Sequence, residues 1–362
     1  MTSTSAGTQI KKYWFLDLLR GFAALWVFLT HLSGHGENKS LFDLNLKWLI
    51  DLLHDSFIRG FTHTGVLIFI VLSGFVINLN YKNQSLKFGF VLNRFWRLFP
   101  IFLTGAVLGY ATFFLEKNYW PPLQNIFSDL SFLGGLNFSV VSGHNSILST
   151  VHSEFFLYVS YFLASCLIGI KTKQHLWALI FAAAFYSLGS IWLINANDYN
   201  LWLARFPSFV IFLLPWWLGV MASDLIQKDI SKKFALPVLL VATAGLFLLP
   251  VYQSVDSNSK MVALWLCNQL YYSLYFCLLI NYSIAVEERS LKVEKIFKKF
   301  SGLGAISYSL YAVHMPIIIL AEKHIVGNYS KMIAMFVVFL VATICHYFVE
   351  KPLMRLKRAK NS

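Results

Sequence analysis

The first apolar stretch of the chain, LLRGFAALWVFLTH, contains two ionisable residues, Arg20 and His31. An imidazole can act as a general base or a nucleophile, and a guanidinium pairs with phosphate or carboxylate oxygens. In an α-helix, residues eleven positions apart return to nearly the same face, about 16 Å apart along the axis. The alternatives are a cation that snorkels to the membrane surface and a hydrogen-bonded core histidine.

Two further arginines, Arg94 and Arg97, lie in the segment NRFWRLFP. Residues three positions apart share a helix face, and two forked guanidiniums suit the oxygens of a phosphate. The alternative is that both are ordinary positive charges that flank a membrane span on its cytoplasmic side.

A carboxylate, Glu154, lies in the segment HSEFFLY beside His152 and Ser153, which are candidate supporting residues. An ionised group inside a membrane span must be paired or partly solvated. We expect Glu154 to orient the imidazole of His31, as a carboxylate orients a catalytic histidine. The alternative is that Glu154 is a structural partner for a hydroxyl or an amide.

Two other motifs interrupt long apolar runs. In VLIFIVLSGFVI, Ser73 and Gly74 allow close helix approach or the passage of a bound chain. In AISYSLYAVHMP, Tyr308 and His314 precede Pro316, which leaves one backbone carbonyl of its helix without its usual donor. For both motifs, helix packing and structural hydrogen bonding are the alternatives to a place in a functional site.

The elements that must position these residues are membrane-spanning helices. Of the 362 residues, 57% are hydrophobic and 13% are charged, and the mean hydropathy is +0.61. Soluble domains average about 25% charged residues, so this composition excludes a cytosolic enzyme, a disordered chain and a secreted disulfide scaffold. The net charge is +13, but no basic groove with interleaved aromatic residues is visible, and nucleic-acid binding is not expected.

A bilayer core requires about 20 mostly apolar residues per helix. By this criterion the sequence predicts an all-α, polytopic integral membrane bundle of about ten transmembrane helices. The predicted spans are approximately residues 13–33, 61–80, 98–115, 147–170, 175–195, 205–226, 234–253, 261–284, 303–322 and 330–349.

The basic residues gather on one side of these spans. If the N-terminus is cytoplasmic, the inner segments hold 21 of the 30 lysines and arginines, the outer segments hold 8, and Arg20 lies within the first span. The positive-inside rule therefore predicts cytoplasmic termini and a multi-pass protein of the plasma membrane. Residues 1–362 are expected to form one membrane domain with a polar tail at 1–12 and a basic cytoplasmic tail at 353–362. A polar stripe at 41–58 predicts a helix in the outer interface.

Six segments, in order, resemble the acyltransferase-3 family of integral membrane acyltransferases, which O-acylate carbohydrates. They cover nearly the whole chain and read LLRGFAALWVFLTH, GVLIFIVLSGFVI, RFWRLFP, the FFLY segment with its glutamate, ISYSLYAVHMP and HYFVEKP. The resemblance implies that five residues are tied to activity: Arg20, His31, Arg94, Arg97 and Glu154. It also implies a stand-alone form without a C-terminal hydrolase-like domain.

The resemblance further implies transfer of an acyl group, most simply acetyl, from cytoplasmic acyl-coenzyme A to a hydroxyl of a cell-surface or lipid-linked carbohydrate. The three arginines would bind the donor phosphates, with Ser73 and Gly74 beside the donor. His31 would act as general base or transient acyl acceptor, and Glu154 would hold its tautomer. Acetyl-coenzyme A is then a co-substrate, and no metal or tightly bound cofactor is expected. The sequence STVHSE departs from the family, with Ser149 where a tryptophan is usual.

Two other classes of function stay open on the sequence. A polytopic transporter also places histidine, glutamate and arginine in its spans, but it predicts inverted repeats and broken paired helices, which the sequence does not show. A scaffold for glycan export would use the same residues only to stabilise the bundle.

Overall fold

The computed structural model describes residues 12–34, 64–82, 86–132, 145–169, 172–195, 208–226, 235–246, 258–325 and 329–353. Every regular element within these ranges is helical, as the sequence predicts. Three predicted features fall largely or wholly outside the described residues: the N-terminal tail, the C-terminal tail and the interfacial helix at 41–58.

Seven helices within the described ranges are long and apolar enough to cross a membrane. They contain α1 (Trp14–Gly34), α3 (Thr64–Tyr81), α4 (Gly89–Lys117), α6 (Ser149–Leu167), α11 (Asn258–Arg289), α13 (Gly302–His324) and α14 (Tyr329–Cys345). The chain is therefore a multi-pass membrane protein.

The remaining elements are not among these seven. They are α5 (Leu123–Leu130), the 3-10 turn η3 (Ser146–Leu148), α7 (Thr172–Asn195), α9 (Ser208–Ile226), α10 (Ala235–Leu246), α12 (Leu291–Phe300) and the π-helical turn η5 (His346–Glu350). Helices α7, α9 and α10 lie at three of the ten predicted spans, but α9 counts only as a shorter apolar helix and α10 has 12 residues. The count of ten and the orientation of the termini stay predictions.

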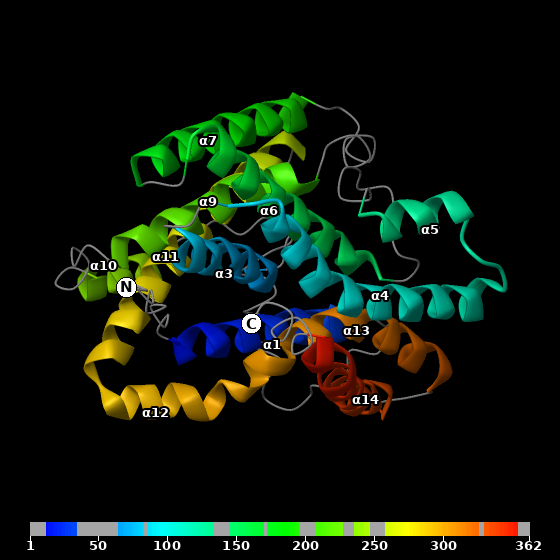
Figure 1. The fold of residues 1–362 in the computed structure, drawn as a ribbon. Coiled ribbons are helices and arrows are strands. Elements are labelled where there is room, and N and C mark those ends of the chain that lie inside the picture. Colours follow the sequence, from blue (N-terminus) through cyan, green and yellow to red (C-terminus); the bar gives the residue numbers. More distant parts are fainter. Residues whose placement is uncertain are drawn as a thin grey trace, which may run out of the picture.

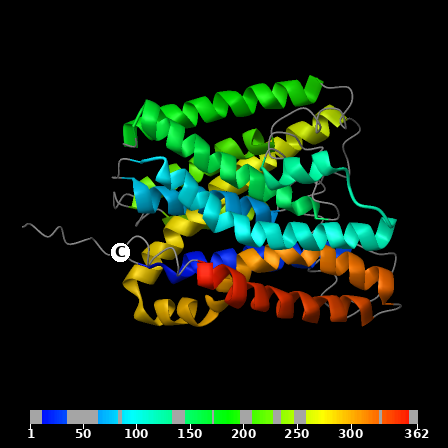
Figure 2. The same ribbon diagram turned by 45° about the vertical axis from the view of Figure 1, so that its right-hand side comes forward.

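Helices distant in the chain are neighbours in the bundle (Figure 1). Helix α1 packs along α13, which also contacts α4 and α14, whereas α9 packs against α3, α6, α7 and α11. Helix α3 contacts both α1 and α9 and so joins the two groups. Figure 2 shows the long helices running side by side, with α7 at one edge and α14 at the opposite edge.

Glycines set the distance between the central helices. A Cβ atom at Gly74 of α3 would overlap the carbonyl oxygen of Trp216 on α9, and one at Gly219 of α9 would overlap the carbonyl oxygen of Val71. Such reciprocal approach of small residues is typical of helix contacts in membranes. Gly74 therefore turns to α9, in line with the packing alternative for this residue.

Glycines also allow the backbones of α1 and α13 to approach closely. A Cβ atom at Gly304 would overlap the carbonyl oxygen of Asp17, and one at Gly21 would lie 2.7 Å from the backbone nitrogen of Gly304. The two helices that carry the sequence-predicted histidines therefore meet backbone to backbone.

The carbonyl that Pro316 leaves without a helical donor is that of Ala312, one turn earlier in α13. The side-chain amide of the buried Asn145 donates to this carbonyl at 2.9 Å and to the carbonyl of Gly105 on α4 at 2.8 Å. One amide thus satisfies the freed carbonyl and fixes α13 against α4 in the turns next to His314.

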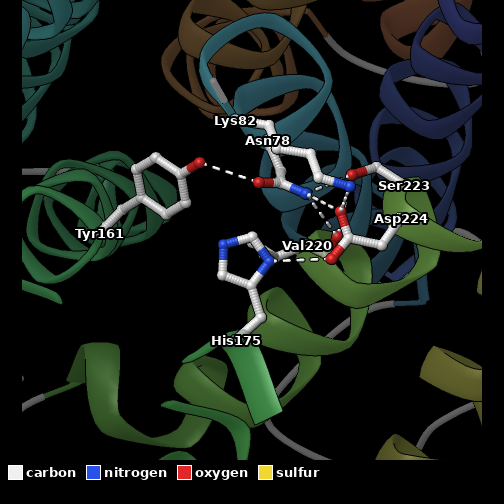
Figure 3. Close-up of polar contacts among 7 residues, drawn as sticks. All are labelled: Asn78, Lys82, Tyr161, His175, Val220, Ser223 and Asp224. Atoms are coloured by element: carbon white, nitrogen blue, oxygen red, sulfur yellow. Dashed lines mark hydrogen bonds and ion pairs between the residues drawn. The ribbon is translucent and has the colours of Figure 1, made fainter. Parts of the chain in front are cut away.

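A cluster of polar side chains connects α3, α6, α7 and α9 (Figure 3). The carboxylate of Asp224 contacts Nζ of Lys82 at 2.6 Å, Nδ1 of His175 at 3.0 Å and Nδ2 of Asn78 at 2.9 Å. The hydroxyl of Tyr161 donates to Oδ1 of Asn78 at 2.9 Å. Because Asp224, His175 and Asn78 are buried, their polar atoms depend on one another for partners.

Candidate active site

A cavity of about 640 Å³ lies among α1, α3, α4, α6 and α13. Six of the residues that the sequence predicts for the site line it: Arg20, Ser73, Arg94, Arg97, Glu154 and Tyr308. Trp14 at the start of α1, Gly302 at the start of α13 and Glu350 in η5 also line it. The cavity is therefore near the end of the bundle that the charge distribution predicts to be cytoplasmic.

The three arginines on the cavity wall differ in their surroundings. Arg97 is exposed to the cavity, and within the described ranges no hydrogen bond or ion pair engages its guanidinium. Arg94 is buried, with its guanidinium 5.0 Å from the ring centre of Tyr81 and 5.6 Å from that of Tyr158. Arg20 pairs with Asp17 at 3.5 Å. Arg97 is thus the cation most available to an anionic ligand.

The carboxylate of Glu154 is held in place by two hydroxyls. It accepts hydrogen bonds from Ser73 at 2.9 Å and from Tyr158, which lies one turn further along α6. The indole nitrogen of Trp216 donates to the hydroxyl of Ser73 at 3.3 Å, so the serine is itself oriented. The negative charge of Glu154 attracts the guanidinium of Arg97, which lines the same cavity.

His31 lies beyond the cavity wall. Its Nδ1 is 3.0 Å from Nε2 of His314, and the two rings are 5.1 Å apart. The ring of Tyr311 is 5.9 Å from that of His314 and 5.6 Å from that of Phe69, which lines the cavity. The rings of Tyr311 and Phe69 therefore form an aromatic layer between His314 and the cavity.

Arg20 and His31 both turn toward α13, as the eleven-residue spacing predicts. Arg20 shares the cavity wall with Gly304 and Ala305, and His31 contacts His314. The structure does not bring His31 to Glu154, because that carboxylate is bonded to hydroxyls of α3 and α6.

The two residues before Glu154 face away from the cavity. The buried ring of His152 packs against Phe102 and Phe132, at 4.9 and 5.0 Å, and Ser153 donates to the backbone carbonyl of Ser149 at 3.1 Å. Both side chains are held by the interior of the bundle and do not line the cavity.

The phenol of Tyr308 is engaged in a contact between two helices. Its hydroxyl donates to the backbone carbonyl of Leu98 on α4 at 2.9 Å, and its side chain lines the cavity. It therefore joins α13 to the helix that carries Arg94 and Arg97.

Sequence reasoning did not select Tyr158 or Asp17 for the site. A helical-spacing signal was present for both, because Tyr158 follows the site glutamate by four residues and Asp17 precedes the first arginine by three.

Glu350 is a further residue of the cavity wall. It accepts a hydrogen bond from Ser309 at 3.1 Å and contacts His346 at 2.9 Å within the π-helical turn. Such turns are frequent at functional sites.

Residues 13–349 match the family described as an acyltransferase domain, Acyl_transf_3. The O-acetyltransferases OatA of Staphylococcus aureus strains NCTC 8325 / PS 47 and COL are each 24% identical over 379 residues, covering 94% of this chain. The chain spans 57% of the length of these curated relatives. No solved structure matches the chain. Because the family match covers nearly all of the described bundle, the chain belongs to the acyltransferase-3 family.

Proposed function

We propose that the protein is a membrane O-acyltransferase of the plasma membrane. It takes an acetyl group from cytoplasmic acetyl-coenzyme A and passes it to a hydroxyl of a cell-surface or lipid-linked carbohydrate. Family membership and the printed activity of the OatA relatives support the reaction class. The observation that carries the proposal is the cavity whose wall combines three arginines, one of them unpaired within the described residues.

The cavity suits the phosphate-bearing part of the donor. Its volume, about 640 Å³, lies within the usual range for small-molecule sites, roughly 300–1,000 Å³. Arg97 offers an exposed fork of donors, Arg20 lies opposite on α1, and Arg94 adds buried positive charge. Guanidiniums bind phosphate oxygens through paired, charge-assisted hydrogen bonds, so this wall holds the anionic end of coenzyme A.

The acyl end of the donor is directed to His31. Along α1 that histidine is about 16 Å from Arg20, a span that the thin pantetheine arm covers. The arm passes the layer formed by Phe69 and Tyr311, which separates the cavity from the histidine pair.

His31 then acts as the general base. It removes the proton of the carbohydrate hydroxyl while that oxygen attacks the thioester carbonyl, so the new C–O ester bond forms and the C–S bond breaks. The imidazolium returns the proton to the departing thiolate, and free coenzyme A leaves. In the variant of this mechanism with a transient acyl-histidine, the same nitrogen attacks first and the hydroxyl second.

Glu154 acts at the donor end of the site. Its carboxylate, fixed by Ser73 and Tyr158, faces the positive wall and limits the electrostatic repulsion between the arginines when no donor is bound. We propose this role for Glu154 in place of the one expected from the sequence, which was to orient the imidazole of His31.

The test is transfer of label from acetyl-coenzyme A by the purified protein in lipid nanodiscs, with cell-envelope carbohydrate as acceptor. We expect His31→Ala to abolish transfer while the protein keeps its thermal unfolding profile. His324→Ala, which removes an exposed histidine at the end of α13, serves as the control and keeps wild-type transfer. A wild-type protein that consumes no acetyl-coenzyme A would contradict the proposal and favour a transporter or a scaffold.

A further inference from the structure

The contact between His31 and His314 determines which nitrogen of each ring carries hydrogen. Nδ1 of His314 lies 3.2 Å from the backbone carbonyl of Leu310, one turn earlier in α13. A carbonyl oxygen only accepts hydrogen bonds, so this Nδ1 is the protonated nitrogen of the ring.

The second nitrogen of His314 is therefore an acceptor. The side chain is fully buried, with 0% exposure, and the ring of Phe28 meets it edge to face at 6.0 Å. Burying a charge among apolar groups is costly, which favours the neutral ring with a single N–H. Its Nε2 then carries a lone pair, and the atom that faces this lone pair at 3.0 Å is Nδ1 of His31.

We propose that His314 is a positioning residue that holds His31 in the tautomer with hydrogen on Nδ1. This leaves Nε2 of His31 as the basic atom, and Nε2 is the nitrogen that takes the proton of the acceptor hydroxyl. The reaction assigned to that nitrogen rests on the proposed function, whereas the tautomer rests on the contact between the rings alone.

The ring of His314 is itself firmly placed. Asn145 binds the carbonyl of Ala312, two residues away, and Pro316 follows on the same helix. The ring of Tyr311 packs against it at 5.9 Å. An acceptor fixed in this way favours the tautomer of His31 with hydrogen on Nδ1, whereas in the other tautomer the reactive nitrogen carries hydrogen.

Two substitutions at one position separate this role from simple packing. In His314→Gln the amide oxygen reaches the place of Nε2 and still accepts from His31. In His314→Asn the shorter side chain reaches only the place of Nδ1, so the bond to the Leu310 carbonyl is kept and the bond to His31 is lost. Both variants place a polar amide at the same buried position, which makes them matched controls.

We expect His314→Gln to keep kcat within a few-fold of wild type and His314→Asn to lose more, in proportion to the share of His31 that passes to the other tautomer, but less than the roughly 100-fold loss of the general base itself. The KM for acetyl-coenzyme A should not change in either variant, because the arginine cavity lies beyond the aromatic layer. An Asn variant as active as the Gln variant would overturn the proposal.

The tautomer is read directly by ¹⁵N NMR of histidine-labelled protein in nanodiscs, with His31→Ala used to assign the signal. The proposal predicts hydrogen on Nδ1 of His31 in the wild type and in His314→Gln, and a mixture in His314→Asn. Hydrogen on Nε2 in the wild type would overturn it. If the wild type transfers no acyl group, the proposed function fails, and the NMR signals still decide the tautomer.

Discussion

Removing the guanidinium of Arg97 should weaken binding of coenzyme A by about 10- to 30-fold. This side chain is exposed to the cavity and has no hydrogen-bond or ion-pair partner within the described ranges, so Arg97→Ala breaks no hydrogen bond or ion pair there. A hydrogen bond between charged groups contributes about 1.5–3 kcal/mol, and about 1.4 kcal/mol corresponds to tenfold in affinity. Solvent in the open cavity screens the charge, which places the effect in the lower part of that range.

Calorimetric titration of the protein in nanodiscs measures this loss. Coenzyme A is compared with pantetheine, which lacks the phosphates and should bind the variant and the wild type equally. Arg289→Ala is the matched control, because it removes an exposed guanidinium at the end of α11 that does not line the cavity. Equal affinity of Arg97→Ala and wild type for coenzyme A, or an equal loss of pantetheine binding, would refute the reasoning.

Two predictions concern stability. Asp224→Asn removes the buried carboxylate charge that pairs with the partly buried ammonium of Lys82, so we expect about 3 kcal/mol of destabilisation, seen as a lower thermal unfolding midpoint in detergent. An unchanged midpoint would show that this charge is not needed for stability. Gly74→Ala forces a methyl group against the carbonyl of Trp216 and should cost about 1–3 kcal/mol. Gly89→Ala, which meets nothing within 4 Å, is its control, and equal unfolding midpoints for these two variants would contradict the packing account.

Spacing along single helices was sufficient to predict much of the site. The i, i+3 arginines share the cavity wall because α4 begins at Gly89 and is continuous over both. Arg20 and His31 face the same neighbouring helix because α1 is continuous over Trp14–Gly34. In both cases the information lies within one helix, where periodicity fixes the direction of each side chain.

Contacts between helices could not be predicted in the same way. The partner of His31 is 283 residues away in the chain, and the hydroxyl of Ser73 reaches Glu154 across 81 residues. These pairings depend on how closely the backbones approach, which is set by glycines such as Gly304 at the crossing of α1 and α13. Long apolar runs predict helices, but they do not say which helices are neighbours.

The most direct test of the central claim is a cryo-EM structure of the protein with a non-hydrolysable acetyl-coenzyme A analogue bound in nanodiscs. The account predicts phosphate oxygens within hydrogen-bonding distance of Arg97 and Arg20, with the acyl end beyond Phe69 and next to Nε2 of His31. Density for the analogue outside this cavity, or an acyl end remote from His31, would contradict it.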